Sequence, residues 1–211
     1  MWGSKSIYKY IPKDERSAKN SSSQYTSKLY QSERDLVETD PEWKIILNKG
    51  TVYLPNFFCL QSDTTIFNKL KKELIPENMI NWSQHYKFEN PDTSETFKSI
   101  VDQLATHFNV QILQTRLNYY RNGSDWKPFH HDSHAYSNQI REDYTMGVSF
   151  GASRQLDFKH ESTGKMFSFP QNNGDIFAFD SNVNKLFKHG IPKDSKVEND
   201  RISIICWGKK L

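Results

Sequence analysis

A histidine and an aspartate lie two positions apart in the segment His130-His131-Asp132. On an extended strand, residues i and i+2 point to the same side, so His130 and Asp132 could offer an imidazole and a carboxylate to one metal ion. A distant histidine, His189 in FKHGIPK, would complete a set of two histidines and one carboxylate. Such a triad leaves coordination positions open for oxygen chemistry at Fe(II), whereas a structural zinc site has four protein ligands.

The short motif is weak by itself, because three histidines crowd into residues 130–134 and a polar loop would also explain them. Arg201 strengthens the interpretation, since it begins the strand-like stretch RISIICW. A buried arginine on a core strand needs a partner to offset its desolvation. A dicarboxylate co-substrate would supply that partner through a two-pronged salt bridge. In RLNYYRNG, Asn118 and Tyr120 share one face of a strand and can hydrogen-bond a carboxylate or a keto group.

The elements that must position these residues change in type along the chain. GTVYLPNFFC (50–59) predicts a strand that enters a turn. The spacing of apolar residues predicts helices over 64–76 and over 94–108, with Ser94 as the N-cap of the second. From residue 111 onward, short alternating segments are separated by Gly, Asn, Asp or Pro. The sequence therefore predicts an α+β fold, in which an antiparallel barrel or jelly roll is buttressed by N-terminal helices.

Composition sets the remaining limits. The 211 residues suffice for one domain, which we expect over residues 41–211, after a flexible extension over residues 1–40 that is rich in Ser, Lys, Asn and Gln. Cys59 and Cys206 are too few for a structural zinc site, and we expect two buried thiols in a reducing compartment. Without a membrane span or a secretory signal, we expect a soluble, intracellular monomer in the nucleus or cytoplasm. A net charge of +3 permits a polyanionic partner without requiring one.

The order NYYRNGSD, HHD, VSFGASRQLDFKH, GDIFAF, KHGIPK and NDRISI resembles the AlkB-type nucleic-acid dioxygenases, from about Val52 to Trp207. The stretch MGVSFGASRQLDFKH is the most similar to the nuclear DNA-repair members. The resemblance implies a double-stranded β-helix (jelly-roll) fold and the use of Fe(II), 2-oxoglutarate and O2. It also implies that the iron ligands are His130, Asp132 and His189. The residues that it implies for 2-oxoglutarate binding are Asn118, Tyr120 and Arg201.

Two positions depart from the family pattern RxNxxxR. Ser203 stands at the position of the asparagine, and Trp207 stands at the position of the second arginine. Because of its position, we include Ser203 among the residues expected to bind the co-substrate. Repair members also carry an acidic residue shortly after the metal aspartate, whereas this chain has Ser133, His134 and Ala135. The preferred base is therefore the part of the resemblance that transfers least.

Other side chains near these motifs have a plain structural interpretation. Trp126 and Phe129 could stack on a base or pack in the core. We expect Arg154 to be a solvated turn residue, although it could also approach a phosphate. We expect solvent-facing positions for the remaining histidines of this part of the chain, namely His131, His134 and His160.

The expected function is oxidative demethylation of N-alkylated bases in DNA or RNA, with nucleic acid as the substrate. The alternative is a protein side-chain hydroxylase that uses the same cofactors, because the triad and Arg201 do not determine the substrate. A catalytically inactive jelly-roll binding module is the alternative from another class, and the intact set of candidate ligands argues against it.

Overall fold

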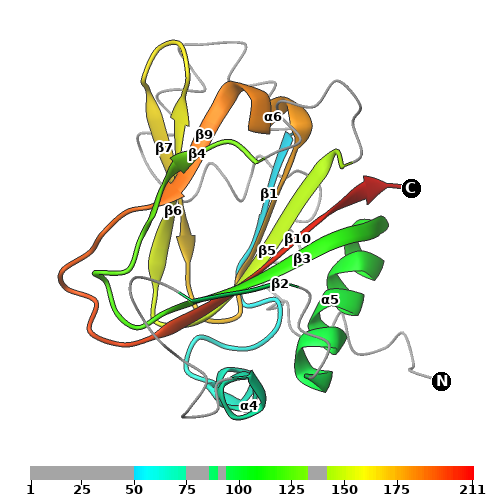
Figure 1. Cartoon of the computed structure of the whole chain (residues 1–211), viewed down its shortest axis with the longest axis vertical. Helices are drawn as coiled ribbons and strands as arrows, with labels where there is room; N and C mark the ends of the chain where they lie inside the picture. Colours follow the sequence, from blue (N-terminus) through cyan, green and yellow to red (C-terminus); the bar gives the residue numbers. More distant parts are fainter. Residues whose placement is uncertain (1–49, 75–85, 90–93, 133–141) are drawn as a thin grey trace.

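Two antiparallel sheets and three helices form the described part of the computed structural model, which comprises residues 50–74, 86–89, 94–132 and 142–211 (Figure 1). The expected extension over residues 1–40 lies outside the described residues, as does His134. The elements, in chain order, are β1 (Thr51–Leu54), α4 (Thr65–Leu74), β2 (Tyr86–Glu89), α5 (Glu95–Phe108), β3 (Val110–Tyr120), β4 (Lys127–His130), β5 (Tyr144–Gly151), β6 (Arg154–His160), β7 (Met166–Gln171), β8 (Ile176–Asp180), α6 (Ser181–Leu186), β9 (Phe187–Ile191) and β10 (Arg201–Lys210). None of the described helices is long and apolar enough to span a membrane.

The larger sheet has the strand order β1-β8-β5-β10-β3-β2, and the smaller sheet has the order β4-β9-β6-β7. Every pair of neighbouring strands is antiparallel. In Figure 1 the two sheets form separate layers, and α4 and α5 lie beside the larger one. The predicted combination of N-terminal helices with a C-terminal antiparallel β-core is confirmed.

Two hydrophobic cores follow from the alternation of side chains along the strands of the larger sheet. On β10, Ile202, Ile204 and Cys206 belong to the core that also contains the buried faces of α4 and α5. The opposite face of the sheet, with β6, β7 and β9, surrounds a second core that is rich in phenylalanine. The odd-numbered residues of β10 therefore face the smaller sheet.

Both predicted helices are present with nearly the expected bounds. Ser94 caps α5, because its Oγ accepts a hydrogen bond from the backbone N–H of Phe97 at 2.9 Å. The two helices are also linked, since the Glu73 carboxylate at the end of α4 accepts hydrogen bonds from Ser94 and Thr96. Cys59 and Cys206 are buried free thiols, as predicted.

Candidate active site

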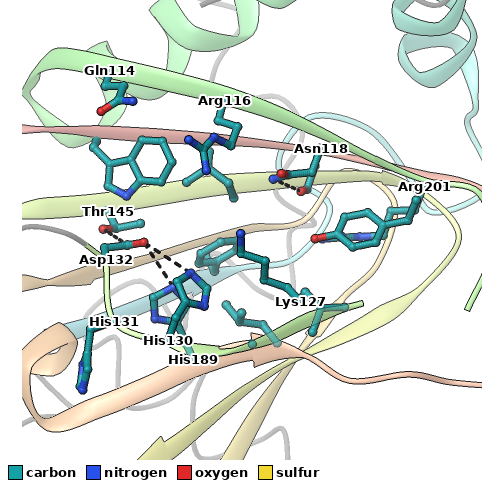
Figure 2. A pocket seen from close by; sticks show the side chains of 18 residues that line it. Gln114, Arg116, Asn118, Lys127, His130, His131, Asp132, Thr145, His189 and Arg201 are labelled. Carbon is teal, nitrogen blue, oxygen red and sulfur yellow. Dashed lines mark hydrogen bonds and ion pairs between the residues drawn. The ribbon is translucent and has the colours of Figure 1, made fainter. Parts of the chain in front are cut away.

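One pocket of about 230 Å³ lies between the two sheets. The larger sheet contributes polar side chains from β3 and β10, and the smaller sheet contributes residues of β4 and β9 (Figure 2). The lining residues used below are Gln114, Arg116, Asn118, Tyr120, Lys127, His130, Asp132, Thr145, His189, Arg201, Ser203 and Trp207. All seven residues predicted to hold the metal or the co-substrate are among them.

His130, Asp132 and His189 form one cluster, in which the possible ligand atoms all lie within 4.8 Å of one another. The Asp132 Oδ1 atom is 3.8 Å from His130 Nε2 and 3.6 Å from His189 Nε2. The fold creates this cluster by pairing β4 with β9, which places His130 directly opposite His189. Gly190 permits the close approach of these strands, since a Cβ atom there would lie 2.7 Å from the Lys127 carbonyl oxygen.

Asp132 is fixed by three residues from outside the cluster. Asn184 of α6 receives a hydrogen bond from the backbone N–H of Asp132 at 2.9 Å and donates one to its carbonyl at 3.2 Å. Thr145 of β5 donates its hydroxyl to Asp132 Oδ2 at 2.9 Å, and the Trp207 side chain also hydrogen-bonds the carboxylate. The carboxylate is thereby held in place before any ion binds.

The electrostatics of the cluster favour deprotonated ligands. Burial, together with the proximity of His189, lowers the pKa of His130 to about 4. Burial by itself would raise the pKa of Asp132, but the charge and hydrogen bonds of His189 and the hydrogen bond from Trp207 hold it well below its usual range. Both groups are consequently available to a cation at neutral pH.

The donor set fits a divalent transition-metal ion. His130 Nδ1 lies 2.9 Å from the Pro128 carbonyl oxygen. A hydrogen bond there would assign the proton to Nδ1 and leave Nε2 as a metal ligand, which is the usual arrangement in metal sites. Two imidazoles and one carboxylate are also the donors that non-haem Fe(II) prefers.

Arg201 is buried at the other end of the pocket, with only 1% of its surface exposed. Its Nε donates to Ser149 Oγ at 2.8 Å, and its guanidinium lies 5.0 Å from the centroid of the Tyr120 ring. Burial lowers the pKa of Arg201 to about 10, so the side chain remains a cation at neutral pH. Its Nη1 and the Asn118 Oδ1 atom are buried and have no hydrogen-bond partner among the described residues. A bound carboxylate would provide the partner that Nη1 needs.

The registers of β3, β10 and β5 arrange the pocket wall as four successive rows. The first row contains Tyr120 and Arg201, and the second contains Asn118 beside Ser203. The third contains Arg116 opposite Ile205, and the fourth contains Gln114, Trp207 and Thr145. Since Thr145 binds Asp132, the fourth row lies at the metal cluster, and the first row lies at the buried guanidinium of Arg201.

Three expectations about neighbouring residues are wrong, each because distant segments cover the side chain. Arg154 is 4% exposed, and its guanidinium donates to the carbonyl oxygens of Asn122, Asp125 and Pro192. His160 is 8% exposed and packs against the Phe187 ring. The side chain of His131 is 5% exposed and contacts Glu161 and the Asn184 carbonyl.

Several residues of the site escaped prediction. Gln114 and Arg116 precede Asn118 and Tyr120 at alternate positions of the same strand, so continuing the alternation backward would have found them. Asn184 and Lys127 carry no such signal in the sequence, because contacts between distant segments bring them to the site. Trp126 and Phe129 are 37% and 40% exposed, so neither is a core residue.

Comparisons with known proteins agree with this geometry. Residues 59–205 match the family described as the 2OG-Fe(II) oxygenase superfamily. Uncharacterized protein R406 of Acanthamoeba polyphaga mimivirus is 35% identical over 102 residues, which cover 48% of this chain and 49% of that protein. The match thus spans about half the length of this relative. A solved Pseudomonas putida prolyl-4-hydroxylase has a similar fold, with a TM-score of 0.52, 12% identity, and coverage of 83% of this chain and 99% of that chain.

The family match covers most of the chain and includes all the residues of the metal cluster and of the Arg201 end. Members of this family use Fe(II), 2-oxoglutarate and O2, and the chain carries a three-donor cluster whose residue types suit iron. The chain belongs to the 2OG-Fe(II) oxygenase superfamily.

Proposed function

We propose that His130, Asp132 and His189 hold the iron of this dioxygenase and that Arg201 binds the distal carboxylate of 2-oxoglutarate. One observation carries the assignment, namely that a three-donor cluster and a buried arginine with an open Nη1 occupy opposite ends of one pocket. Asn118, Tyr120 and Ser203 complete the co-substrate site, because they occupy the two rows at the Arg201 end. We also propose that the two sheets form the double-stranded β-helix predicted from the sequence.

Iron with 2-oxoglutarate and dioxygen supplies the oxidising power to hydroxylate an unactivated C–H bond. The chain itself contributes position and environment. Asn184 fixes the backbone of Asp132, Thr145 fixes its carboxylate, and Arg201 anchors the co-substrate at the far end of the pocket. The buried phenylalanine core beneath β6 and β9 keeps water away from the floor of the pocket.

A protein side chain is the first candidate substrate. One solved structure with a similar fold is that of a prolyl-4-hydroxylase, and the similarity spans 99% of that chain. At 12% identity this likeness concerns the fold, so it supports the candidate without fixing the amino acid that is modified.

An N-alkylated base in DNA or RNA is the second candidate, and three observations favour it. The stretch MGVSFGASRQLDFKH resembles the AlkB-type enzymes, and cations outnumber acids among the described residues that line the pocket. Trp126 and Phe129 also remain exposed on the segment that leads to His130, where a base could stack on them. A base within a duplex would first have to leave the stack.

Parallel assays with the two classes of substrate separate the two candidates. Iron-loaded protein is given 2-oxoglutarate with either a panel of N-methylated oligonucleotides or a pool of peptides from a cell extract, at matched concentrations. Succinate formation and the mass change of each substrate are measured, with Asp132→Ala as the control. Succinate that rises only with peptides supports the hydroxylase, and formaldehyde released from oligonucleotides supports the demethylase. No succinate under any condition would contradict the assigned iron and co-substrate residues.

A further inference from the structure

Three strands meet at the Arg201 end of the pocket, and each contributes one lining residue there. Tyr120 ends β3, in the same row as Arg201. Ile191 ends β9, two residues beyond His189 and on the same side of the strand. Leu156 belongs to β6, the strand beside β9. The size of this end of the pocket therefore depends on how closely β3, β6 and β9 are held together.

Arg154 joins the ends of these strands. It is the first residue of β6, lies two positions before Leu156, and is 4% exposed. Its guanidinium donates hydrogen bonds to the carbonyl oxygens of Asn122 at 3.2 Å and Asp125 at 2.9 Å, both in the connection that follows β3. It also donates to the carbonyl oxygen of Pro192, which follows β9 directly. One rigid, planar group thus connects β6 to the residues that follow β3 and β9.

The same guanidinium contacts the pocket wall from behind the lining. It lies 5.6 Å from the centroid of the Tyr120 ring, and the Arg201 guanidinium lies 5.0 Å from the same centroid. Arg154 is not among the described residues that line the pocket. It is therefore placed to hold Tyr120 beside Arg201 rather than to touch a bound molecule.

The two connections that Arg154 joins, residues 121–126 and 192–200, also pair with each other. The backbone N–H of Gly123 donates to the Val197 carbonyl at 2.7 Å, and the backbone N–H of Asp194 donates to the Gly123 carbonyl at 2.9 Å. A Cβ atom at Gly123 would lie 1.7 Å from the Asp194 carbonyl oxygen, so the close approach requires glycine. In Figure 1 the β3–β4 and β9–β10 connections lie on the same side of the molecule. Arg154 and these backbone bonds hold both connections as one unit at this end.

Resting on the proposed function, we propose that Arg154 is a positioning residue that fixes the depth of the co-substrate site and thereby its choice of keto acid. The metal cluster and Arg201 lie at opposite ends of the pocket, so a co-substrate that reaches both must match the distance between them. Arg154 sets this distance indirectly, because it holds the strand ends that carry Tyr120 and Ile191. With the clamp in place, a longer dicarboxylate does not fit.

Binding of two keto acids to the Mn(II)-loaded protein without oxygen tests the depth of the site. 2-Oxoadipate has the same end groups as 2-oxoglutarate and one more methylene. We expect the unsubstituted protein to bind 2-oxoglutarate at least about tenfold more tightly, because one methylene in a pocket of fixed size changes affinity by roughly 10- to 200-fold. In Arg154→Met, 2-oxoglutarate should bind more weakly and this ratio should fall severalfold.

Two further variants separate the clamp from the charge. Arg154→Lys keeps the cation and should recover only part of the ratio, since an ammonium cannot reproduce the fork that reaches both connections. Lys159→Met removes a cation from an exposed position of the same strand and should leave the ratio unchanged. Mn(II) affinity should be unchanged in every variant, because the hydrogen bonds that hold Asp132 do not involve Arg154.

Hydrogen exchange of the protein without metal or keto acid tests the clamp directly. The amide protons of Gly123 and Asp194 bond across the two connections, so both should exchange faster in Arg154→Met than in Lys159→Met. Urea unfolding of the same variants measures the loss of global stability. A purely structural role would lower stability and speed exchange without changing the ratio of the two keto acids.

The outcomes are distinguishable. An unchanged keto-acid ratio in Arg154→Met, or full recovery of the ratio by Arg154→Lys, overturns the clamp and leaves the proposed function standing. If Arg154→Met does not fold, the ratio in Arg154→Lys decides by itself, and a value equal to that of the unsubstituted protein overturns the clamp. Failure of the unsubstituted protein to bind either keto acid would overturn the proposed co-substrate site, and this inference with it.

Discussion

His189 lies directly opposite His130 across the β4–β9 pair, and the centroids of the two imidazole rings are 4.4 Å apart. Strand pairing therefore sets the distance between two of the three candidate ligands, and only Asp132 depends on contacts made beyond the end of β4. Different substitutions consequently test the cluster and its support separately.

The first prediction concerns the ligands themselves. Loss of a residue that only supports a metal ligand weakens metal binding by roughly 10- to 100-fold. We expect a larger loss of Mn(II) affinity when a ligand itself is removed, as in the variants His130→Ala, Asp132→Ala and His189→Ala. Isothermal titration measures the affinity, and circular dichroism checks that the strands remain. His131→Ala should have a smaller effect, because that side chain contacts Glu161 and the Asn184 carbonyl. Normal Mn(II) binding by Asp132→Ala would refute the cluster.

The second prediction concerns the co-substrate. Arg201→Ala should weaken 2-oxoglutarate binding by about 2–5 kcal/mol, because truncation leaves a desolvated carboxylate without its partner. Arg201→Lys should recover part of the loss, since an ammonium cannot reproduce the planar fork. Anaerobic titration of the Mn(II)-loaded protein measures this affinity. Arg121→Ala is the matched control, because Arg121 pairs with Asp125 and is absent from the pocket lining. An equal loss of 2-oxoglutarate affinity in Arg201→Ala and Arg121→Ala would show a general effect of positive charge rather than a specific contact.

The third prediction concerns the support of Asp132. Asn184 is fully buried and hydrogen-bonds both backbone polar groups of Asp132. Asn184→Ala should lower Mn(II) affinity by roughly 10- to 100-fold, as other losses of outer partners do. Asn182→Ala, at an exposed position of the same helix, should leave the affinity unchanged. Equal affinities for the two variants would mean that Asp132 is held without Asn184.

The fourth prediction concerns the two helices and the pH. Burial by itself would raise the pKa of Glu73, but the hydrogen bonds from Ser94 and Thr96 prevail and lower it. A carboxyl whose folded pKa is depressed stabilises the protein above its unfolded pKa of 4.5 and loses this contribution as the pH falls through the folded pKa. Glu73→Gln should therefore lower the free energy of unfolding at pH 7, with a difference that shrinks below about pH 4.5. Urea unfolding at several pH values measures this, and a difference independent of pH would rule out the carboxylate charge as the cause.

The helices could be predicted, and the seven candidate site residues could be proposed, because each leaves a local signal in the sequence. Apolar spacing marks α4 and α5, and alternation places Asn118 and Tyr120 on one face of β3. In the structure these seven residues line one pocket, and we propose their roles in binding.

What could not be predicted depends on pairings between distant segments. The burial of Arg154 has no signal in the sequence, because its acceptors are backbone carbonyls of two other loops, which no residue type reveals. The burial of His160 has the same kind of cause, since this side chain packs against Phe187 of β9. Lys127 lines the pocket at a point where the pairing of β4 with β9 is irregular, and such an irregularity has no reliable pattern in the sequence.

Asp132 connects three parts of the fold, since it lies beside the histidines of the smaller sheet, binds Thr145 of the larger sheet and is clamped by Asn184 of α6. An ion held by the cluster would therefore fasten the two layers to each other at this end. Proteases cleave chains that open transiently, so a link of this kind slows degradation as well as unfolding. The supply of iron in a cell would then govern how long each molecule survives, in addition to how fast it works.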